Sequence, residues 1–466
     1  MSKTAVAETD PASDAVLESS RNLALYRDHV NPQWVKLLDL LQMNVKYKRC
    51  EGVELFTDDG RRILDFLSGY CVHNTGHNHP RIVSALQAEL ARFGPAMLQS
   101  HVPELAGELA ARLCERSGGR LQKCFFCSSG SEGIEAVIKF ARACTGRSGI
   151  VYASGAFHGL TCGALSMMGE DSFWRRGFGP LLANMEEVKF GDLEALERKL
   201  ATRAIAAVVL EPVQGEAGIR IPGEGYLNGV QALCRKYGTL FVLDEVQTGL
   251  GRTGKFLAAH HYGVEPDMVV MAKALSGGLI PVGAVLMSDK VYDSVYDSLK
   301  RAIIHTSTYS ENGLAMRAGL ATLQVLEDED LPCQAERLGD YIRERLRARL
   351  ALYEMIKEVR GVGLMSGIEF VAPQQIRLRI AFEAFKKVHA GMFGQMIVMR
   401  LFRDKNILTQ ICGNSFMVLK VAPPLVVNEQ QCDEFVDAVG DVVEAIHSSG
   451  AFWSDALGLA GRVINI

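Results

Sequence analysis

Three charged side chains follow apolar, β-rich runs in the middle of this 466-residue chain. They are Glu211, Asp244 and Lys273, and the runs are Ile205–Leu210, Thr239–Leu243 and Asp267–Met271. A lysine at the end of a buried strand can form a Schiff base with an aldehyde, because burial lowers its pKa. A carboxylate at the end of a neighbouring strand can keep a nearby ring nitrogen protonated. Taken singly, Lys273 is better explained as a solvated surface group and Asp244 as a helix N-cap.

A cofactor that has both an aldehyde for the lysine and a ring nitrogen for the carboxylate is pyridoxal phosphate. This cofactor also needs a phosphate site. The stretch Phe125–Lys139 predicts a short strand, a Ser-Ser-Gly-Ser turn and a helix. Backbone N–H groups and the dipole at such a helix start bind phosphate dianions. The same turn is explained equally well as a capping box in which Ser128 or Ser131 is the cap.

The elements that would position these groups have the pattern of a parallel sheet covered by helices. The apolar runs alternate with helical patterns such as Gly225–Tyr237, which is typical of βαβ units. Ligands of such sheets bind outside the carboxyl ends of the strands. We therefore expect the three charged groups to face one crevice. Near the N-terminus, Val53–Phe66 predicts a β-hairpin around an Asp-Asp-Gly turn.

The same pattern divides the chain into a large central domain and a small domain built from both chain ends. From about Ala335 onward, helices and strands alternate without the central βαβ rhythm. The expected boundaries are a flexible polar arm at 1–20, the first part of the small domain at 21–74, the large domain at 75–334, and the second part of the small domain at 335–466.

Composition and charge exclude several classes of protein. With 48% hydrophobic and 22% charged residues, the chain should fold as a globular protein. A net charge of -4 gives no overall basic surface for nucleic acid. No apolar run is long enough for a transmembrane segment, and the first residues lack the pattern of a secretory signal. Eleven scattered cysteines favour a reduced, cytoplasmic protein over a disulfide framework.

Five segments, in this order, resemble the class III aminotransferases, a family that includes the ornithine, acetylornithine, 4-aminobutyrate and putrescine enzymes. The segments are Gly76–Pro80, Ser154–Gly159, Glu211–Gly218, Phe241–Gly254 and Ala272–Gly278. The resemblance runs from about Leu55 to Ala445 and is strongest to putrescine and ornithine aminotransferases. It implies the α/β architecture of fold type I: a mostly parallel seven-stranded sheet in the large domain and a small α+β domain from both chain ends.

The resemblance also implies roles for individual residues around pyridoxal phosphate. Lys273 would hold the cofactor covalently and then shuttle a proton, and Asp244 would pair with the pyridinium nitrogen. Thr308 would bind the phosphate of the neighbouring subunit, which implies a homodimer with shared active sites. The full cofactor-binding set is Gly130, Ser131, Phe157, His158, Glu211, Asp244, Val246, Gln247, Lys273 and Thr308. The substrates would be an amine donor and a 2-oxo acid acceptor such as 2-oxoglutarate or pyruvate, used in a ping-pong mechanism.

The sequence departs from these relatives where they bind a substrate carboxylate. Lys420 stands where ornithine and putrescine aminotransferases carry an arginine, and Glu216 matches the glutamate that pairs with that arginine. A lysine lacks the planar fork that binds a carboxylate with two hydrogen bonds. Leu160 replaces a basic residue frequent in relatives, and Tyr70 matches a substrate-lining tyrosine. We therefore expect a terminal amine without an α-carboxylate, with Lys420 serving 2-oxoglutarate or glutamate as the simpler alternative.

Other functions stay open at this point. They are an ornithine- or acetylornithine-type enzyme, an enzyme acting on a large apolar or lipid-like aldehyde that resembles hopanoid-pathway aminotransferases, a mutase, racemase or decarboxylase on the same scaffold, and a non-catalytic homologue. The Met- and Phe-rich stretch Gln375–Val398 is longer than in relatives and predicts a core or dimer helix, or else an apolar substrate entrance. The tail Ala451–Ile464 is expected to pack on the protein, with a membrane-surface helix as the alternative.

Two further motifs are more simply explained by structure than by metal binding. Cys124 and Cys127 form a CxxC motif, but no second pair follows at zinc spacing. They are therefore expected to be core residues. His77 and His79 have no visible third ligand, so no metal site is expected there.

Overall fold

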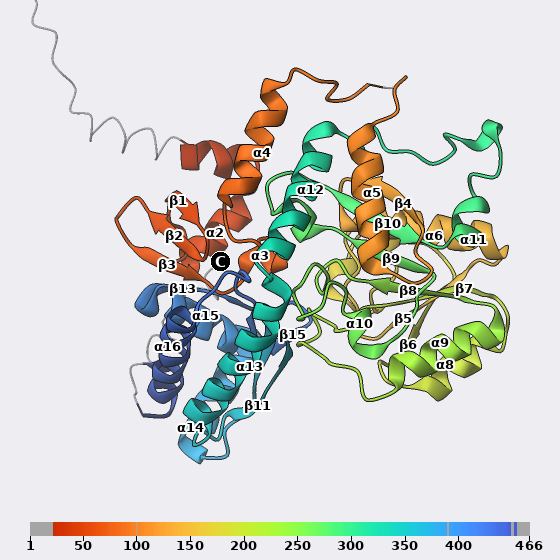
Figure 1. Ribbon diagram of the computed structural model, residues 1–466. Coiled ribbons are helices and arrows are strands. Elements are labelled where there is room, and N and C mark those ends of the chain that lie inside the picture. The colour runs from red at the N-terminus through yellow and green to blue at the C-terminus, as the bar shows by residue number, and fades with distance from the viewer. Residues whose placement is uncertain (1–21, 99, 389–390, 449–451, 454–466) are drawn as a thin grey trace, which may run out of the picture.

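The computed structural model describes residues 22–98, 100–388, 391–448 and 452–453. At its centre is a seven-stranded sheet with the order β4-β10-β9-β8-β7-β5-β6 (Figure 1). The strands are β4 (Lys123–Cys127), β5 (Gly149–Ala153), β6 (Met185–Val188), β7 (Ile205–Leu210), β8 (Leu240–Asp244), β9 (Met268–Met271) and β10 (Gly283–Met287). Only β10 runs antiparallel to its neighbours in this sheet. The predicted α/β class with a mostly parallel seven-stranded sheet is confirmed.

Both faces of this sheet are buried, which explains why its central strands are continuous apolar runs rather than alternating ones. Every residue of β7, β8 and β9 is buried. Along β7, Val208 packs into one core cluster while its neighbours Ala207 and Val209 pack into a second cluster. The helices of this part are α4 (Pro80–Ala91), α5 (Glu104–Ser117), α6 (Gly130–Thr145), α7 (Cys162–Leu165), α8 (Leu193–Leu200), α9 (Tyr226–Tyr237), α10 (Ala259–Tyr262), α11 (Asp289–Asp293) and α12 (Gly313–Asp328).

Segments from both ends of the chain form the second, smaller part of the molecule (Figure 1). One sheet has the order β1-β2-β3-β13 and the other has the order β11-β12-β15-β14. Their strands are β1 (Tyr47–Glu51), β2 (Glu54–Thr57), β3 (Arg62–Asp65), β11 (Ile356–Val362), β12 (Met365–Phe370), β13 (Ile407–Leu408), β14 (Gln410–Cys412) and β15 (Ser415–Val421). The parallel pairing of β13 with β3 joins the two chain ends directly. The predicted hairpin at Val53–Phe66 forms as β2 and β3.

The helices of the small part include the long apolar stretch singled out in the sequence. They are α2 (Pro32–Leu40), α3 (Ser68–Cys71), α13 (Leu331–Leu350), α14 (Ile376–Val388), α15 (Met392–Lys405) and α16 (Glu429–Ser448). On α15, Phe393, Met396 and Met399 are buried, so this helix is mostly core. The expected N-terminal arm lies outside the described residues, and so does the predicted tail apart from Phe452 and Trp453, which are buried.

No helix in the described ranges is long and apolar enough to cross a membrane.

Candidate active site

The charged groups at the ends of three adjacent strands line a single cavity. Glu211 follows β7, Asp244 ends β8, and Lys273 follows β9 by two residues. These strands are direct neighbours in the sheet, so their carboxyl ends open on the same side. The cavity has a volume of about 1150 Å³ and contains all three side chains in its wall.

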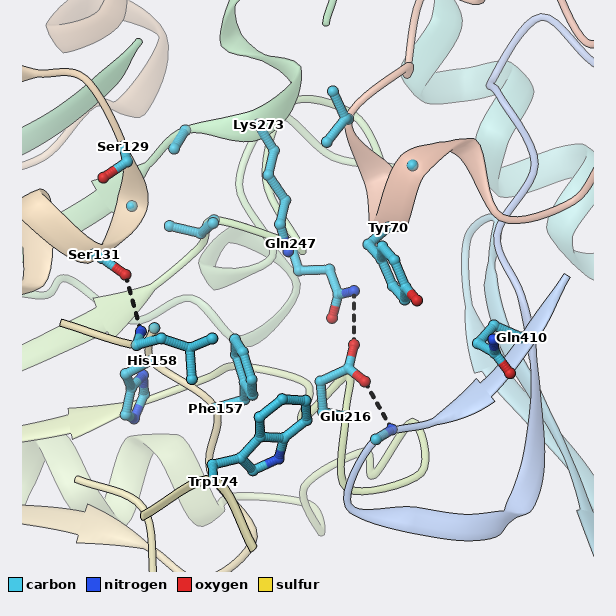
Figure 2. Close-up of a pocket in the computed structure, with 18 of the residues that line it drawn as sticks. Tyr70, Ser129, Ser131, Phe157, His158, Trp174, Glu216, Gln247, Lys273 and Gln410 are labelled. Carbon is cyan, nitrogen blue, oxygen red and sulfur yellow. Dashed lines mark hydrogen bonds between the residues drawn. The ribbon is translucent and has the colours of Figure 1, made fainter. Parts of the chain in front are cut away.

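Lys273 is held in a strained backbone conformation at the edge of this cavity. Its φ of +46° lies in the left-handed region, which for a residue other than glycine costs on the order of 1–3 kcal/mol. It begins a short 3₁₀ turn, Lys273–Ser276, directly after the last strand residues of β9. Figure 2 shows its side chain extending into the cavity, and no described group accepts a hydrogen bond from its Nζ. The amine is therefore positioned at the cavity and has no competing hydrogen-bond acceptor.

Asp244 is oriented by two hydrogen bonds. Its Oδ2 lies 2.8 Å from Nδ1 of the fully buried His158, and its Oδ1 accepts a hydrogen bond of 3.0 Å from the Val246 amide. Burial lowers the pKa of His158, but its hydrogen bond to Asp244 and the charges of Asp244 and Glu211 outweigh burial and raise that pKa overall.

Glu211 interacts electrostatically with both His158 and Asp244. Its carboxylate accepts hydrogen bonds from the Phe157 amide at 3.0 Å and the Gly215 amide at 3.1 Å. Burial raises the pKa of Glu211 to about 7, because these amides and His158 only partly offset desolvation and the charge of Asp244. Its side chain therefore changes charge close to neutral pH.

The predicted phosphate site forms at the start of α6. Ser129 is the N-cap, since its Oγ accepts a hydrogen bond of 3.2 Å from the Glu132 amide. The prediction of Ser128 or Ser131 as the cap was wrong. The helix begins at Gly130, so Ser129 occupies the cap position. Ser131 instead uses its Oγ to accept a hydrogen bond of 3.2 Å from the Leu160 amide.

Two features of this helix start fit a bound anion. Among the described residues, no group accepts a hydrogen bond from the backbone N–H of Gly130 or Ser131. A Cβ atom on Gly130 would lie 2.9 Å from a methyl carbon of Val246, so only glycine lets the helix start approach the cavity this closely. Unpaired N–H groups at a helix N-terminus are a favourable site for a phosphate.

The remaining predicted residues of the cavity wall lie on both sides of Lys273. Phe157 packs edge-on against Trp174 with ring centroids 5.7 Å apart. Gln247 donates a hydrogen bond of 3.5 Å from its Nε2 to Glu216. Figure 2 shows Phe157, Gln247 and Glu216 around the space below Lys273. The cavity wall also contains Val246 and Leu160.

The partly buried Glu216, in the cavity wall, forms an ion pair with the fully buried Lys420 behind it. Lys420 is 0% exposed, is not part of the cavity lining, and donates a hydrogen bond from Nζ to Glu216. Burial raises the pKa of Glu216, but the charge and hydrogen bond of Lys420 and the amide of Gly413 outweigh it and lower that pKa overall. Burial lowers the pKa of Lys420, and Glu216 reverses that shift. Both groups therefore stay charged and satisfy each other.

Tyr70 separates Lys420 from the cavity. The Lys420 Nζ lies 4.8 Å from the centre of the Tyr70 ring, and Tyr70 itself lines the cavity. Residues 68–71 have φ between +48° and +69°, a left-handed turn in which only Gly69 is a glycine. Such a turn costs roughly 1–2 kcal/mol for each residue with a side chain, and nothing in the sequence predicted it. The buried Arg252 stabilises the turn by donating hydrogen bonds to Ser68 and Asn74.

Thr308 lies apart from the other predicted residues. It is exposed in the single chain and is not in the cavity wall. This position is compatible with the predicted contact to a partner subunit's phosphate, which stays a prediction.

Apart from the predicted Tyr70, sequence reasoning missed the residues that the small domain contributes to the cavity. The turn between β14 and β15 contacts the large domain. In that turn, Asn414 accepts a hydrogen bond of 3.0 Å from Trp174 Nε1, and Gly413 donates one of 2.8 Å to Glu216. Neither Trp174 nor Asn414 belongs to a segment with a recognisable chemical pattern. Only the apolar stretch around α15 gave a signal, since its Met392 lines the cavity.

Comparison with known proteins gives the family. The profile of the family described as aminotransferase class-III matches residues 39–443. The chain belongs to the class III aminotransferases. Aminotransferase PigE of Serratia sp. (strain ATCC 39006) is 38% identical to it over 473 aligned positions, covering 95% of this chain and 55% of PigE. This aminotransferase chain thus spans about half the length of that curated relative.

Solved structures agree with this family. The ornithine aminotransferase of Toxoplasma gondii ME49 has a TM-score of 0.78 at 28% identity, covering 91% of this chain and 99% of that chain. An amine transaminase from an uncultivated Pseudomonas species, in its PLP-bound form, has a TM-score of 0.76 at 28% identity, covering 86% of this chain and 95% of that chain. Pyridoxal phosphate is accordingly the cofactor of this aminotransferase, and the unpaired amides at the start of α6 fit its phosphate.

The two remaining motifs have structural explanations. Cys127 is buried and Cys124 is partly buried, and both thiols are free. His77 Nε2 lies 2.7 Å from Asp65, and His79 Nε2 lies 3.0 Å from Glu329. Across the described ranges, no group of three His, Cys, Asp or Glu side chains could hold a metal ion.

Proposed function

We propose that this aminotransferase moves the amino group of a terminal amine that has no α-carboxylate to a 2-oxo acid such as 2-oxoglutarate or pyruvate. The observation that carries the proposal is the burial of Lys420 behind Tyr70 in an ion pair with Glu216. In the described part of the cavity wall, Lys273 is the only lysine or arginine. A substrate carboxylate would therefore find no free cation besides the catalytic amine.

The residues at the strand ends supply the chemistry of the transfer. Bound pyridoxal phosphate supplies an electron sink for the carbon that bears the amine. Lys273 would hold the cofactor, and its Nζ would later take the proton from that carbon and return it during the second half of the cycle. Asp244, oriented by its hydrogen bonds to His158 and the Val246 amide, would hold a proton on the ring nitrogen. The amides of Gly130 and Ser131 would bind the phosphate.

A single cavity favours a ping-pong order. Amine and 2-oxo acid must both reach Lys273, and the described cavity has one set of catalytic groups. The two substrates would therefore occupy the same space in turn. Binding a 2-oxo acid would require Glu216 to release Lys420, because no other cation of the described wall is free to meet its carboxylate.

The homodimer belongs to this proposal. Thr308 is exposed and does not line the cavity of its own chain, which supports a role at the site of a partner subunit. Mixing Lys273→Ala chains with Thr308→Ala chains should produce heterodimers with one intact site and one doubly altered site. Activity recovered on mixing supports sharing, whereas a fully active monomer at high dilution would refute it.

An ornithine-type activity is the second candidate. Its specific support is the structural likeness to the ornithine aminotransferase of Toxoplasma gondii ME49. The two candidates differ in whether a substrate carboxylate can displace Glu216 from Lys420. Glu216→Gln leaves Lys420 without its counter-charge. If the ion pair excludes ornithine, this variant should react faster with ornithine than the wild-type enzyme does.

Single-turnover spectroscopy of the holoenzyme tests the choice. Each amine is mixed with enzyme in the absence of an oxo acid, and the loss of the cofactor's absorbance is followed in time. We expect a terminal alkylamine to react with a higher apparent second-order rate constant than ornithine. Ornithine exceeding every carboxylate-free amine by a wide margin would contradict the proposal, and steady formation of rearranged or decarboxylated product would indicate a mutase or decarboxylase instead.

A further inference from the structure

The cavity that contains Lys273 extends well beyond the catalytic groups. Its volume of about 1150 Å³ exceeds the usual range for small-molecule sites, roughly 300–1,000 Å³. Part of its wall comes from the small domain, from α2, from the start of α15 and from the β14–β15 hairpin. We refer to this part as the tail site, and its residues are Leu37, Leu40, Leu41, Met392, Gln395, Gln410, Ile411 and Phe416.

The tail site has no charged side chain, unlike the rest of the cavity. The charged groups of the described wall are Glu211, Glu216, Asp244 and Lys273, with His158 beside them, and all belong to the large domain. The polar side chains of the tail site are two neutral amides, Gln395 and Gln410. A second charge on a substrate would thus be desolvated there without a counter-charge, which costs several kcal/mol.

Two helices supply most of the apolar surface. On α2, Asn31 caps the helix start and Pro32 occupies the first turn, so the N-terminal chain is fixed where it presents Leu37 and Leu40 to the cavity. On α15, Phe393 and Met396 anchor the helix in the core, which leaves Met392, only 5% exposed, at the inner wall. The sequence segment that contributes α15 is the Met- and Phe-rich stretch for which an apolar substrate entrance was one prediction.

We propose that the tail site binds the neutral, apolar chain of the amine substrate, with the chain running from Lys273 to Met392 and Leu37. This inference rests on the proposed function, since it assigns the body of the same amine. The inference is narrower than the proposed function, because it excludes diamines and ω-amino acids. The second charge of these substrates would lie against the neutral wall of the tail site. Figure 2 shows Trp174, Glu216 and Gln410, three of the residues that line the cavity.

A homologous series of amines tests the assignment on the holoenzyme. Apparent second-order rate constants for loss of cofactor absorbance are measured from propylamine to decylamine. Each fully buried methylene is worth about 0.8 kcal/mol, or about a fourfold gain, so we expect about a two- to fourfold rise per methylene until the site is filled. Unreactive n-alkanols should inhibit competitively with the same dependence on chain length. The diamine and the ω-amino acid of matching length should gain nothing over propylamine.

Variants at the two helices separate this site from general effects. Met392→Trp should shorten the longest amine that still gains, and it should lower the rate constants of long alkylamines more than that of propylamine. Leu37 is 41% exposed, so Leu37→Glu should fold, weaken the long alkylamines about tenfold and favour the diamine of equal length. The matched control is Trp34→Glu, on the same helix and 45% exposed but outside the cavity wall, which should change neither series.

The outcomes also distinguish this inference from the proposed function. If no carboxylate-free amine reacts, or ornithine exceeds them all, the proposed function fails. If short and long alkylamines react equally, if the diamine matches the alkylamine, or if Leu37→Glu and Trp34→Glu behave alike, the tail site is refuted while the proposed function stands.

Discussion

The two halves of the cavity are built by different physical means. In the large-domain half, charged groups stand at strand ends and each is held by hydrogen bonds, as Asp244 is by His158 and Val246. In the small-domain half, the wall is neutral and consists of side chains from helices and one hairpin. Charges require fixed partners, which a parallel sheet provides at the carboxyl ends of its strands. An apolar wall requires only shape, which helices from distant parts of the chain can supply.

The boundary between the halves is the ion pair of Glu216 and Lys420. Glu216 is in the cavity wall and bonds the small-domain hairpin through Gly413, whereas Lys420 is hidden behind Tyr70. The pair therefore neutralises a cation that could otherwise attract a carboxylate. Reaction chemistry should depend on the first half of the cavity, and the choice of amine on the second half and this boundary.

The largest effect is expected at the catalytic amine. Lys273→Ala should lower turnover by about 10⁴-fold, because it removes the group that carries the proton. Borohydride reduction of the native holoenzyme should add the cofactor's mass to the peptide that contains Lys273. Labelling at another lysine would overturn this assignment, and the exposed Lys255 provides a control, since Lys255→Ala should retain wild-type activity.

Removing one member of the Glu216–Lys420 ion pair should have the next largest effect, in this case on the free energy of unfolding. Lys420→Met leaves the partly buried Glu216 without its cation and should lower the free energy of unfolding by about 3 kcal/mol. The double variant Lys420→Met with Glu216→Gln should recover more than half of that loss, because neither charge remains. Urea denaturation measures both. Equal decreases in the free energy of unfolding of the single and double variants would mean that the two residues are not energetically coupled.

The charged half should also show a pH dependence that the neutral half lacks. Glu211 has a pKa raised from its ordinary value of 4.5 to about 7, so the folded protein holds this proton more tightly than the unfolded chain does. Its contribution to stability is complete below about pH 4.5 and is lost as pH rises through about 7, up to about 3 kcal/mol. The Glu211→Gln variant should lose this dependence. Unfolding free energies of both proteins at pH 5 and pH 8 provide the measurement, and parallel changes in the two would contradict it.

The smallest effect concerns the phosphate site. Gly130→Ala places a Cβ 2.9 Å from Val246, so we expect about a tenfold weaker hold on the cofactor, about 1–2 kcal/mol. Gly107→Ala is the matched control, because it is also helical and its Cβ would meet nothing within 4 Å. That control should leave cofactor affinity unchanged and stabilise α5 by about 0.5–1 kcal/mol. Fluorescence titration of the apo-protein with pyridoxal phosphate compares the two.

The sequence predicted the large-domain elements because their patterns are local. The run at Ile205–Leu210 is β7 to the residue, and the helix expected at Gly225–Tyr237 begins one residue later, at Tyr226. Continuous burial on both faces gives a β-strand an uninterrupted apolar sequence, and this signal does not depend on distant residues. The cap of α6 was misplaced at Ser128 or Ser131, because three serines within four residues compete for one position and only the entry angle of the chain selects Ser129.

By itself, the sequence determined that Lys273, Asp244 and Glu211 stand at strand ends, and that Gly130 opens a helix. These positions follow from local periodicity and from motifs within a few residues. The tertiary structure alone decided that Lys420 is hidden by Tyr70, that Trp174 bonds Asn414, and that α2 and α15 complete a neutral wall. Each of those contacts joins segments more than a hundred residues apart, and their geometry depends on strain and packing that no local pattern records.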